Sequence, residues 1–219
     1  MHMGKIGIVT ALLLAGIALQ PAAAKTFKWA NDLDAATLDP YARNVVFDLM
    51  FAESTYEGLT RRGPDLKLEP SLATEWKLVA PTTWRYTLRR NVRFQDGTPF
   101  TADDVIFSYQ RASAGAGTSI AGYFASVKEM TKVDDFTVDV VTRAPNPVLP
   151  EELANWLIMS KSWSERNNLT RIAEVAKNEE NFAVLHSNGT GPFVVKSRRP
   201  ESRPSGSPMP AGGTSPRTT

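Results

Sequence analysis

The chain has 219 residues, no cysteine and a formal net charge of +2. Its 42% hydrophobic and 22% charged residues are typical of a globular protein, which excludes a collagen-like, wholly disordered or polytopic membrane chain. The lack of cysteine excludes a disulfide scaffold, a cysteine-ligated metal site and a thiol nucleophile. Residues 25–196 hold 20 basic and 22 acidic side chains, so this part is slightly acidic and lacks a charge pattern typical of nucleic-acid binding.

The first 24 residues have the pattern of a signal peptide. Lys5 precedes an apolar run at 6–19, and small residues that signal peptidase accepts follow. A run of this length is short for a membrane-spanning helix, although a retained membrane anchor is the alternative interpretation. Without cysteine after the run, lipoprotein attachment is excluded. We therefore expect export to the periplasm, cleavage near Ala24 and a mature chain that begins at Lys25.

Short-range patterns predict a mixed α/β fold. Alternation of apolar and polar residues predicts strands at 26–29, 76–80 and 84–88. Turn signals next to apolar segments predict further strands at 127–133, 136–141 and 193–196. Apolar spacings of three and four predict helices at 45–56, 102–112, 149–157 and 169–178. We expect the strands at 76–80 and 84–88 to pair through a turn and to bury one face. Residues 197–219 are rich in Pro, Gly, Ser and Thr, a composition that predicts disorder.

Adjacent carboxylates at Asp103 and Asp104 have two interpretations. They can be taken as the acid and base of a glycosidase. They also follow Thr101 at the start of a predicted helix, where Asp104 is placed to reach back in a capping box. Capping is favoured, because neighbouring helical side chains point about 100° apart and do not act on one bond.

Other candidate sites are weak. His186 is the only histidine after the predicted signal peptide, so neither a histidine-rich metal site nor a supported Ser-His-Asp triad is expected. The sequence at 189–191 resembles a phosphate loop, but it lacks the Gly-Lys-Ser/Thr ending. The five tryptophans (29, 76, 84, 156 and 163) can line an apolar cleft, although core packing is favoured.

The loop at 39–44 is the preferred candidate for ligand contact. It joins a predicted strand to a predicted helix, and strand-to-helix junctions commonly present ligands in α/β proteins. Tyr41, Arg43 and Asn44 are its candidate substrate-binding residues. An ordinary surface loop is an equally good interpretation of the same residues.

Five motifs in order resemble those of the extracytoplasmic solute-binding proteins of ABC importers for peptides, nickel and related solutes (solute-binding protein family 5). They are LDP at 38–40, YEGL at 56–59, PSLATEW at 70–76, the long segment 84–111 that contains FQDGTPFTADDV, and GTGPF at 189–193. The resemblance covers residues 25–196. It implies a type II periplasmic binding fold, a peptide-like small solute, an inner-membrane ABC permease as partner, no cofactor, no metal and no catalysis.

The resemblance also implies a domain arrangement. Residues 25–58 resemble the start of the first ligand-binding lobe, 59–188 an extra domain typical of this family, and 189–196 a return strand to the first lobe. Complete members are more than twice as long, so we expect an incomplete, monomeric chain without the opposite lobe, impaired in binding, with an aberrant tail at 197–219 from a frameshift or truncation. An exported interaction module and, less favoured, an exported hydrolase are the alternatives.

Overall fold

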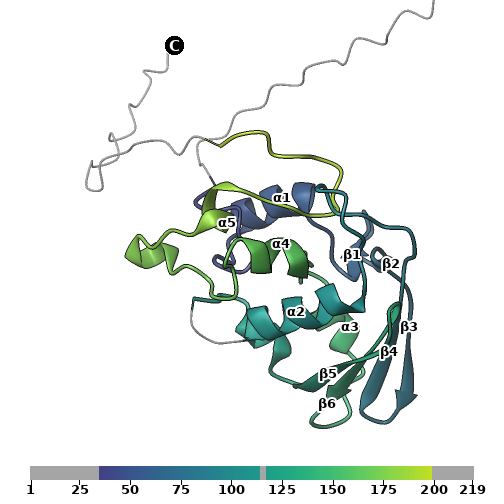
Figure 1. The fold of residues 1–219 in the computed structure, drawn as a ribbon. Coiled ribbons are helices and arrows are strands. Elements are labelled where there is room, and N and C mark those ends of the chain that lie inside the picture. The colour runs from purple at the N-terminus through teal and green to yellow at the C-terminus, as the bar shows by residue number, and fades with distance from the viewer. Residues whose placement is uncertain (1–34, 114–116, 199–219) are drawn as a thin grey trace, which may run out of the picture. The chain divides into compact units, whose positions relative to one another are not determined.

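The computed structural model describes residues 35–113 and 117–198, which fold into a small antiparallel sheet with helices stacked on one side (Figure 1). The strands are β1 (Thr60–Arg62), β2 (Leu68–Pro70), β3 (Ala73–Ala80), β4 (Thr83–Leu88), β5 (Val127–Asp134) and β6 (Thr137–Thr142). The helices are α1 (Val46–Thr55), α2 (Ala102–Ser113), α3 (Leu149–Glu152), α4 (Lys161–Arg166) and α5 (Phe182–Leu185), with short 3-10 turns η1 (Ala121–Phe124) and η2 (Val175–Lys177). This confirms the predicted mixed α/β class. The predicted signal peptide, the strand at 26–29 and residues 199–219 lie outside the described residues.

The main sheet has four antiparallel strands in the order β3-β4-β6-β5. The turn predicted at 81–83 joins β3 to β4, and the turn at Asp134 joins β5 to β6, where the Asp134 carboxylate accepts a hydrogen bond from the Phe136 amide at 2.7 Å. Short polar side chains favour such turns because they bond the backbone two residues on. Both predicted hairpins are therefore confirmed, and β3 and β5 form the two edges.

Helix α2 covers one face of this sheet, and α4 packs on α2 (Figure 1). The start of α2 confirms the capping prediction: the Asp104 carboxylate accepts the Thr101 amide at 2.8 Å. A carboxylate in the first turn satisfies amides that have no partner within the helix. Asp104 also accepts the Lys161 amide at 2.8 Å, so the cap fixes α4 against α2 as well.

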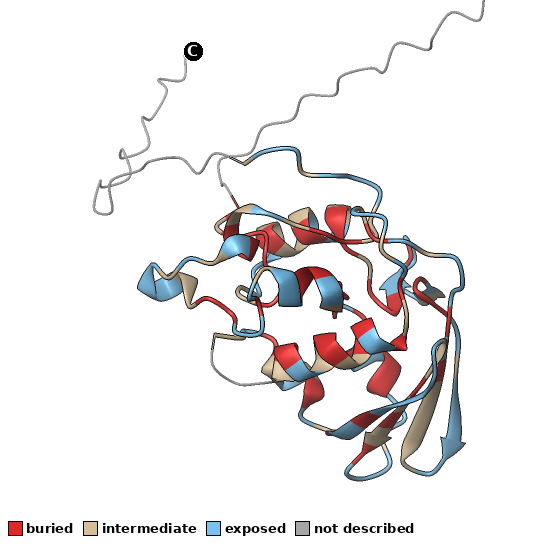
Figure 2. Cartoon of the chain, in the orientation of Figure 1, coloured by how far each residue is buried: buried red, intermediate tan, exposed pale blue. Residues whose placement is uncertain are grey.

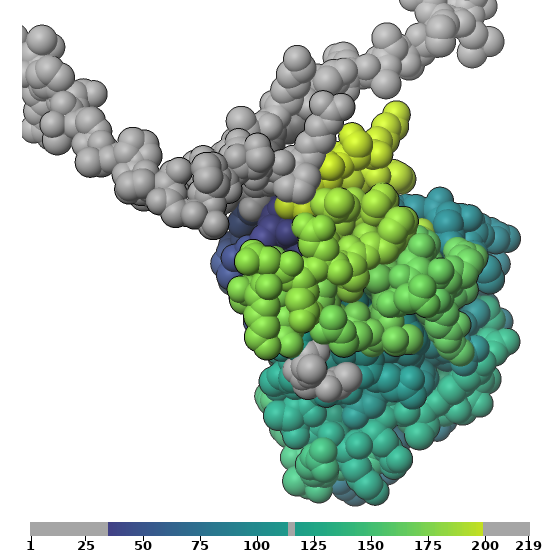
Figure 3. Space-filling model, turned by 60° about the vertical axis from the view of Figure 1, so that its left-hand side comes forward, coloured from purple at the N-terminus to yellow at the C-terminus, as the bar shows by residue number. Residues whose placement is uncertain are grey.

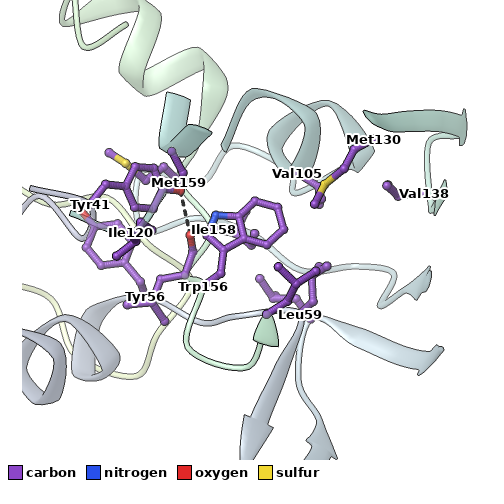
Figure 4. Packing of buried hydrophobic residues seen from close by; sticks show 14 of the residues in the cluster. Tyr41, Tyr56, Leu59, Val105, Ile120, Met130, Val138, Trp156, Ile158 and Met159 are labelled. Carbon is purple, nitrogen blue, oxygen red and sulfur yellow. Dashed lines mark hydrogen bonds between the residues drawn. The ribbon is translucent and has the colours of Figure 1, made fainter. Parts of the chain in front are cut away.

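A single apolar core runs from the sheet to α1 (Figure 4). At one end Val105 of α2 packs with Met130 and Val138 of the sheet, and at the other Tyr41 and Trp156 lie together. Burial follows this core, whereas the outer strand β3 is mostly exposed (Figure 2).

Several predicted elements are corrected. The helix predicted at 149–157 is only the four-residue α3, and the one at 169–178 is replaced by the short turn η2. Helices α4 and α5 were not predicted; each begins with a polar cap, Ser160 and Asn181, whose side chain accepts an amide of the first turn. The predicted strand at 193–196 is not assigned to a strand; it joins no sheet among the described residues.

Candidate functional site

The candidate loop at 39–44 takes its shape from Asp39. The Asp39 carboxylate accepts the Tyr41 amide at 3.1 Å, and the Thr37 hydroxyl accepts the Asp39 amide at 3.0 Å. Such side-chain-to-backbone bonds hold a tight turn without a regular element. The LDP motif therefore forms the predicted turn, and α1 begins six residues after Pro40.

Tyr41 is a core residue rather than a surface residue. Its side chain is fully buried, its hydroxyl donates to the Leu157 carbonyl at 2.8 Å, and its ring lies 5.2 Å from the Arg111 guanidinium carbon. Burial raises the pKa of its phenol, so the group stays neutral. With its hydroxyl already bonded, a solute contact by Tyr41 stays a prediction that requires the loop to move.

Arg43 and Asn44 lie at the surface, as the loop hypothesis requires. The Arg43 guanidinium pairs with the Asp48 carboxylate at 3.3 Å, and the side-chain oxygen Oδ1 of Asn44 accepts a hydrogen bond from the Tyr123 hydroxyl at 3.1 Å. Arg43 and Asn44 are thus neighbours at the surface, whereas Tyr41 is buried in the core. Both side chains keep solvent-exposed area, which a ligand contact requires.

The sequence did not reveal a buried ion pair that joins this loop to α2. The Arg111 guanidinium of α2 donates two hydrogen bonds to the Asp39 carboxylate, at 2.9 and 2.5 Å, and a third to the Leu169 carbonyl at 2.5 Å. Both charged side chains are completely buried. Burial opposes the charge of Arg111, but the attraction of Asp39 outweighs it and raises the Arg111 pKa. The signal was present: Arg111 follows Phe107 by four residues, on the face of α2 that turns inward.

A second polar contact holds the GTGPF motif. The side-chain nitrogen Nε2 of Gln95 donates hydrogen bonds to the Phe193 carbonyl at 2.7 Å and to the Thr55 carbonyl at 3.3 Å. Gly189 lies against the end of α1, where an added Cβ would overlap the Thr55 carbonyl. The motif glycines are therefore needed for close backbone packing, not for phosphate binding.

A cavity of about 330 Å³ lies beside the end of α1. Its charged lining includes Glu53, Glu57, Arg61 and Arg62. Both arginines are paired, Arg61 with Glu69 and Arg62 with Glu151, each at 2.8 Å. Burial raises the pKa of Glu53. The charged lining thus consists of two glutamates and two arginines, so neither sign of charge dominates it.

The remaining candidates have structural roles. Asp103 pairs with Lys132 at 2.9 Å, and Asp104 is the helix cap, so the two carboxylates do not cooperate as an acid–base pair. His186 stacks on Phe182 with ring centroids 3.9 Å apart. Within residues 35–113 and 117–198, no group of three His, Cys, Asp or Glu side chains is placed to hold a metal ion. Over the same ranges, no helix has the length and apolar character required to cross a bilayer.

Residues 67–205 match the model of the bacterial extracellular solute-binding proteins, family 5 Middle. The chain belongs to this family. The match confirms the resemblance that the sequence motifs indicate, and the family consists of binding proteins rather than enzymes.

Relatives of this family-5 chain include periplasmic peptide-binding proteins. The periplasmic murein peptide-binding protein MppA of Escherichia coli is 33% identical over 92 residues, which covers 42% of this chain and 17% of MppA. The periplasmic oligopeptide-binding protein OppA of Salmonella typhimurium is 28% identical and covers 64% of this chain and 31% of OppA. The structure of MoaA from A. tumefaciens R10 with mannopinic acid superposes with a TM-score of 0.64 at 26% identity, over 76% of this chain and 33% of MoaA. The chain therefore spans about a third or less of each of these proteins.

Proposed function

We propose that this chain is an incomplete solute-binding component of an ABC importer for peptides or similar small solutes. The family match at 67–205 carries the proposal, because it links the chain to proteins whose task is solute capture. Two relatives named as peptide-binding support a peptide-like solute. In this proposal the chain is exported to the periplasm with cleavage near Ala24, and its partner is an inner-membrane permease.

The proposed arrangement assigns residues 25–58 and 189–196 to a first lobe and 59–188 to an extra domain. The solute would contact the loop at 39–44, where Arg43 and Asn44 keep atoms at the surface. The chain spans about a third of MoaA and OppA, and in this proposal it supplies only one wall of a two-lobed cleft. Ligands of such proteins are held between closing lobes, so one wall alone binds weakly.

Titration calorimetry of the mature chain from Lys25 tests this proposal, with Ala-Ala and Ala-Ala-Ala as probes. We expect no saturable heat, while E. coli OppA, run under the same conditions, serves as the positive control. Saturable, tight binding of either peptide would overturn the proposed incompleteness. In that case Arg43→Ala and Asn44→Ala should weaken binding, and Lys128→Ala, on the distant strand β5, should not.

A further inference from the structure

Strand β3 is an open edge of the main sheet. It pairs with β4 on one side, and no other strand of the described residues pairs with its opposite side (Figure 1). At this edge, the amide of its first residue, Ala73, donates a hydrogen bond to the Leu59 carbonyl at 2.8 Å. An open edge presents backbone donors and acceptors that can pair with another strand.

The β3 strand is largely exposed (Figure 2), and some of its exposed side chains are apolar. Leu78 is 51% and Val79 42% exposed, and Trp76 is only partly buried. In β6, by contrast, alternate side chains such as Val138 and Val140 are fully buried against α2. Trp76 packs against the edge of the core, whereas Leu78 and Val79 keep apolar area free for a partner.

The charges of β3 are self-complementary about Trp76. Glu75 and Lys77 lie two residues apart, so both side chains point to the same face, and their charged groups are 3.3 Å apart. In an antiparallel pair of identical strands centred on Trp76, each Glu75 would lie opposite the other copy's Lys77. Opposite charges at such positions stabilise a sheet, and the two tryptophans would form an aromatic cross-strand pair on the other face.

We propose that β3 is a homodimerisation edge, at which two copies of this chain pair antiparallel about a two-fold axis through Trp76. The interface is isologous, because the same residues meet on both sides. It joins two four-stranded sheets into one continuous sheet. The sequence led us to expect a monomer, and this surface is the reason to expect association instead.

The other edge of the sheet does not have these properties. On β5, the register with β6 shifts between Val127 and Glu129, so Lys128 and Glu129 do not lie in a regular run and cannot repeat the pattern of β3. Lys132 of β5 is already paired with Asp103 and Asp135. The edge at β3 is thus the better partner for a second copy.

Irregular pairing limits how long the interface can be. The register with β4 shifts between Ala73 and Glu75 and again between Leu78 and Ala80, so only residues 75–78 form a regular run. Bulges of this kind shorten the edge that a second strand can use. We therefore expect a weak dimer that depends on concentration, with the charge pairs deciding whether it forms.

Sedimentation velocity over a wide concentration range tests the proposal on the mature chain. The weight-average mass should rise from the value of one chain toward that of two. Glu75→Lys and Lys77→Glu should each abolish this rise, because like charges then face each other. An equimolar mixture of these two variants should restore it, since every lysine then meets a glutamate, and so should the double variant with both substitutions.

Glu129→Lys on the opposite edge is the matched control and should leave the rise unchanged. All the substituted side chains are more than half exposed, and circular dichroism of each variant verifies that the fold is retained. A wild-type chain that keeps the mass of one chain at every concentration would overturn the proposal. So would a Glu75→Lys variant that associates as the wild type does, because another surface would then be responsible.

Discussion

At the scale of single residues, the buried pair of Asp39 and Arg111 joins three parts of the chain. Asp39 belongs to the candidate loop and Arg111 to α2, while the Leu169 carbonyl that Arg111 also contacts follows α4. The sequence showed both residues inside family motifs, but it could not show that they meet, because they are 72 positions apart. Likewise, spacing placed Tyr41 in a loop and could not reveal that its ring is buried.

Replacing Arg111 by Leu should lower the free energy of unfolding by about 3–5 kcal/mol, because Asp39 would remain buried without its partner. Urea unfolding followed by tryptophan fluorescence measures this loss. Replacing both residues, as Asp39→Asn with Arg111→Met, should recover part of it, since no uncompensated charge then remains. The exposed pair of Arg61 and Glu69 is the control: Arg61→Ala should cost less than about 1 kcal/mol. Equal losses for Arg111→Leu and Arg61→Ala would contradict this account.

At the scale of elements, local patterns predicted where the main helices and strands form. They predicted less well which face of each element is buried. Helix α1 forms where its apolar residues predicted it, yet Val46 is 75% and Met50 60% exposed. The inward side of α1 instead holds Asp48, Ala52 and Thr55, so its large apolar residues do not mark the side that packs inward. The stretch at 193–196 is apolar and follows a turn, as a strand would, but a strand also requires a neighbouring strand, which local sequence does not specify.

The contact between α1 and the GTGPF motif gives a prediction at this scale. Gly189→Ala should destabilise the chain by about 1–3 kcal/mol, because the new methyl group overlaps the backbone carbonyl of Thr55, which cannot turn aside as a side chain would. Gly122→Ala is the matched control, since an added Cβ there meets no atom within 4 Å. It should be neutral or slightly stabilising. Thermal unfolding of the two variants compares them directly, and similar melting temperatures would show that the motif glycine is not needed for packing.

At the scale of the whole molecule, backbone hydrogen bonds cross the boundary between the proposed lobe and the proposed extra domain. Leu38 donates its amide to the Val184 carbonyl at 3.1 Å, and Ile158 donates to the Glu57 carbonyl at 2.9 Å. In Figure 3 the last described residues, in yellow-green, lie against the first ones, in purple. The order of motifs predicted the family, but only the tertiary contacts show how closely 35–58 and 59–198 are packed into one core.

A shortened chain of residues 59–196 should therefore lack a cooperative fold. Removing 25–58 deletes Asp39, which leaves Arg111 buried without its partner, and it takes Tyr41 and Tyr56 out of the core. The loss of the ion pair alone, about 3–5 kcal/mol, approaches the whole stability of a typical domain, about 5–15 kcal/mol. Near-ultraviolet circular dichroism of Trp156 and Trp163, recorded on heating, should show a sharp transition in the mature chain and none in the shortened one. A shortened chain that melts sharply at the same temperature would show instead that 59–188 folds by itself, and it would favour a stand-alone interaction module over a solute-binding protein.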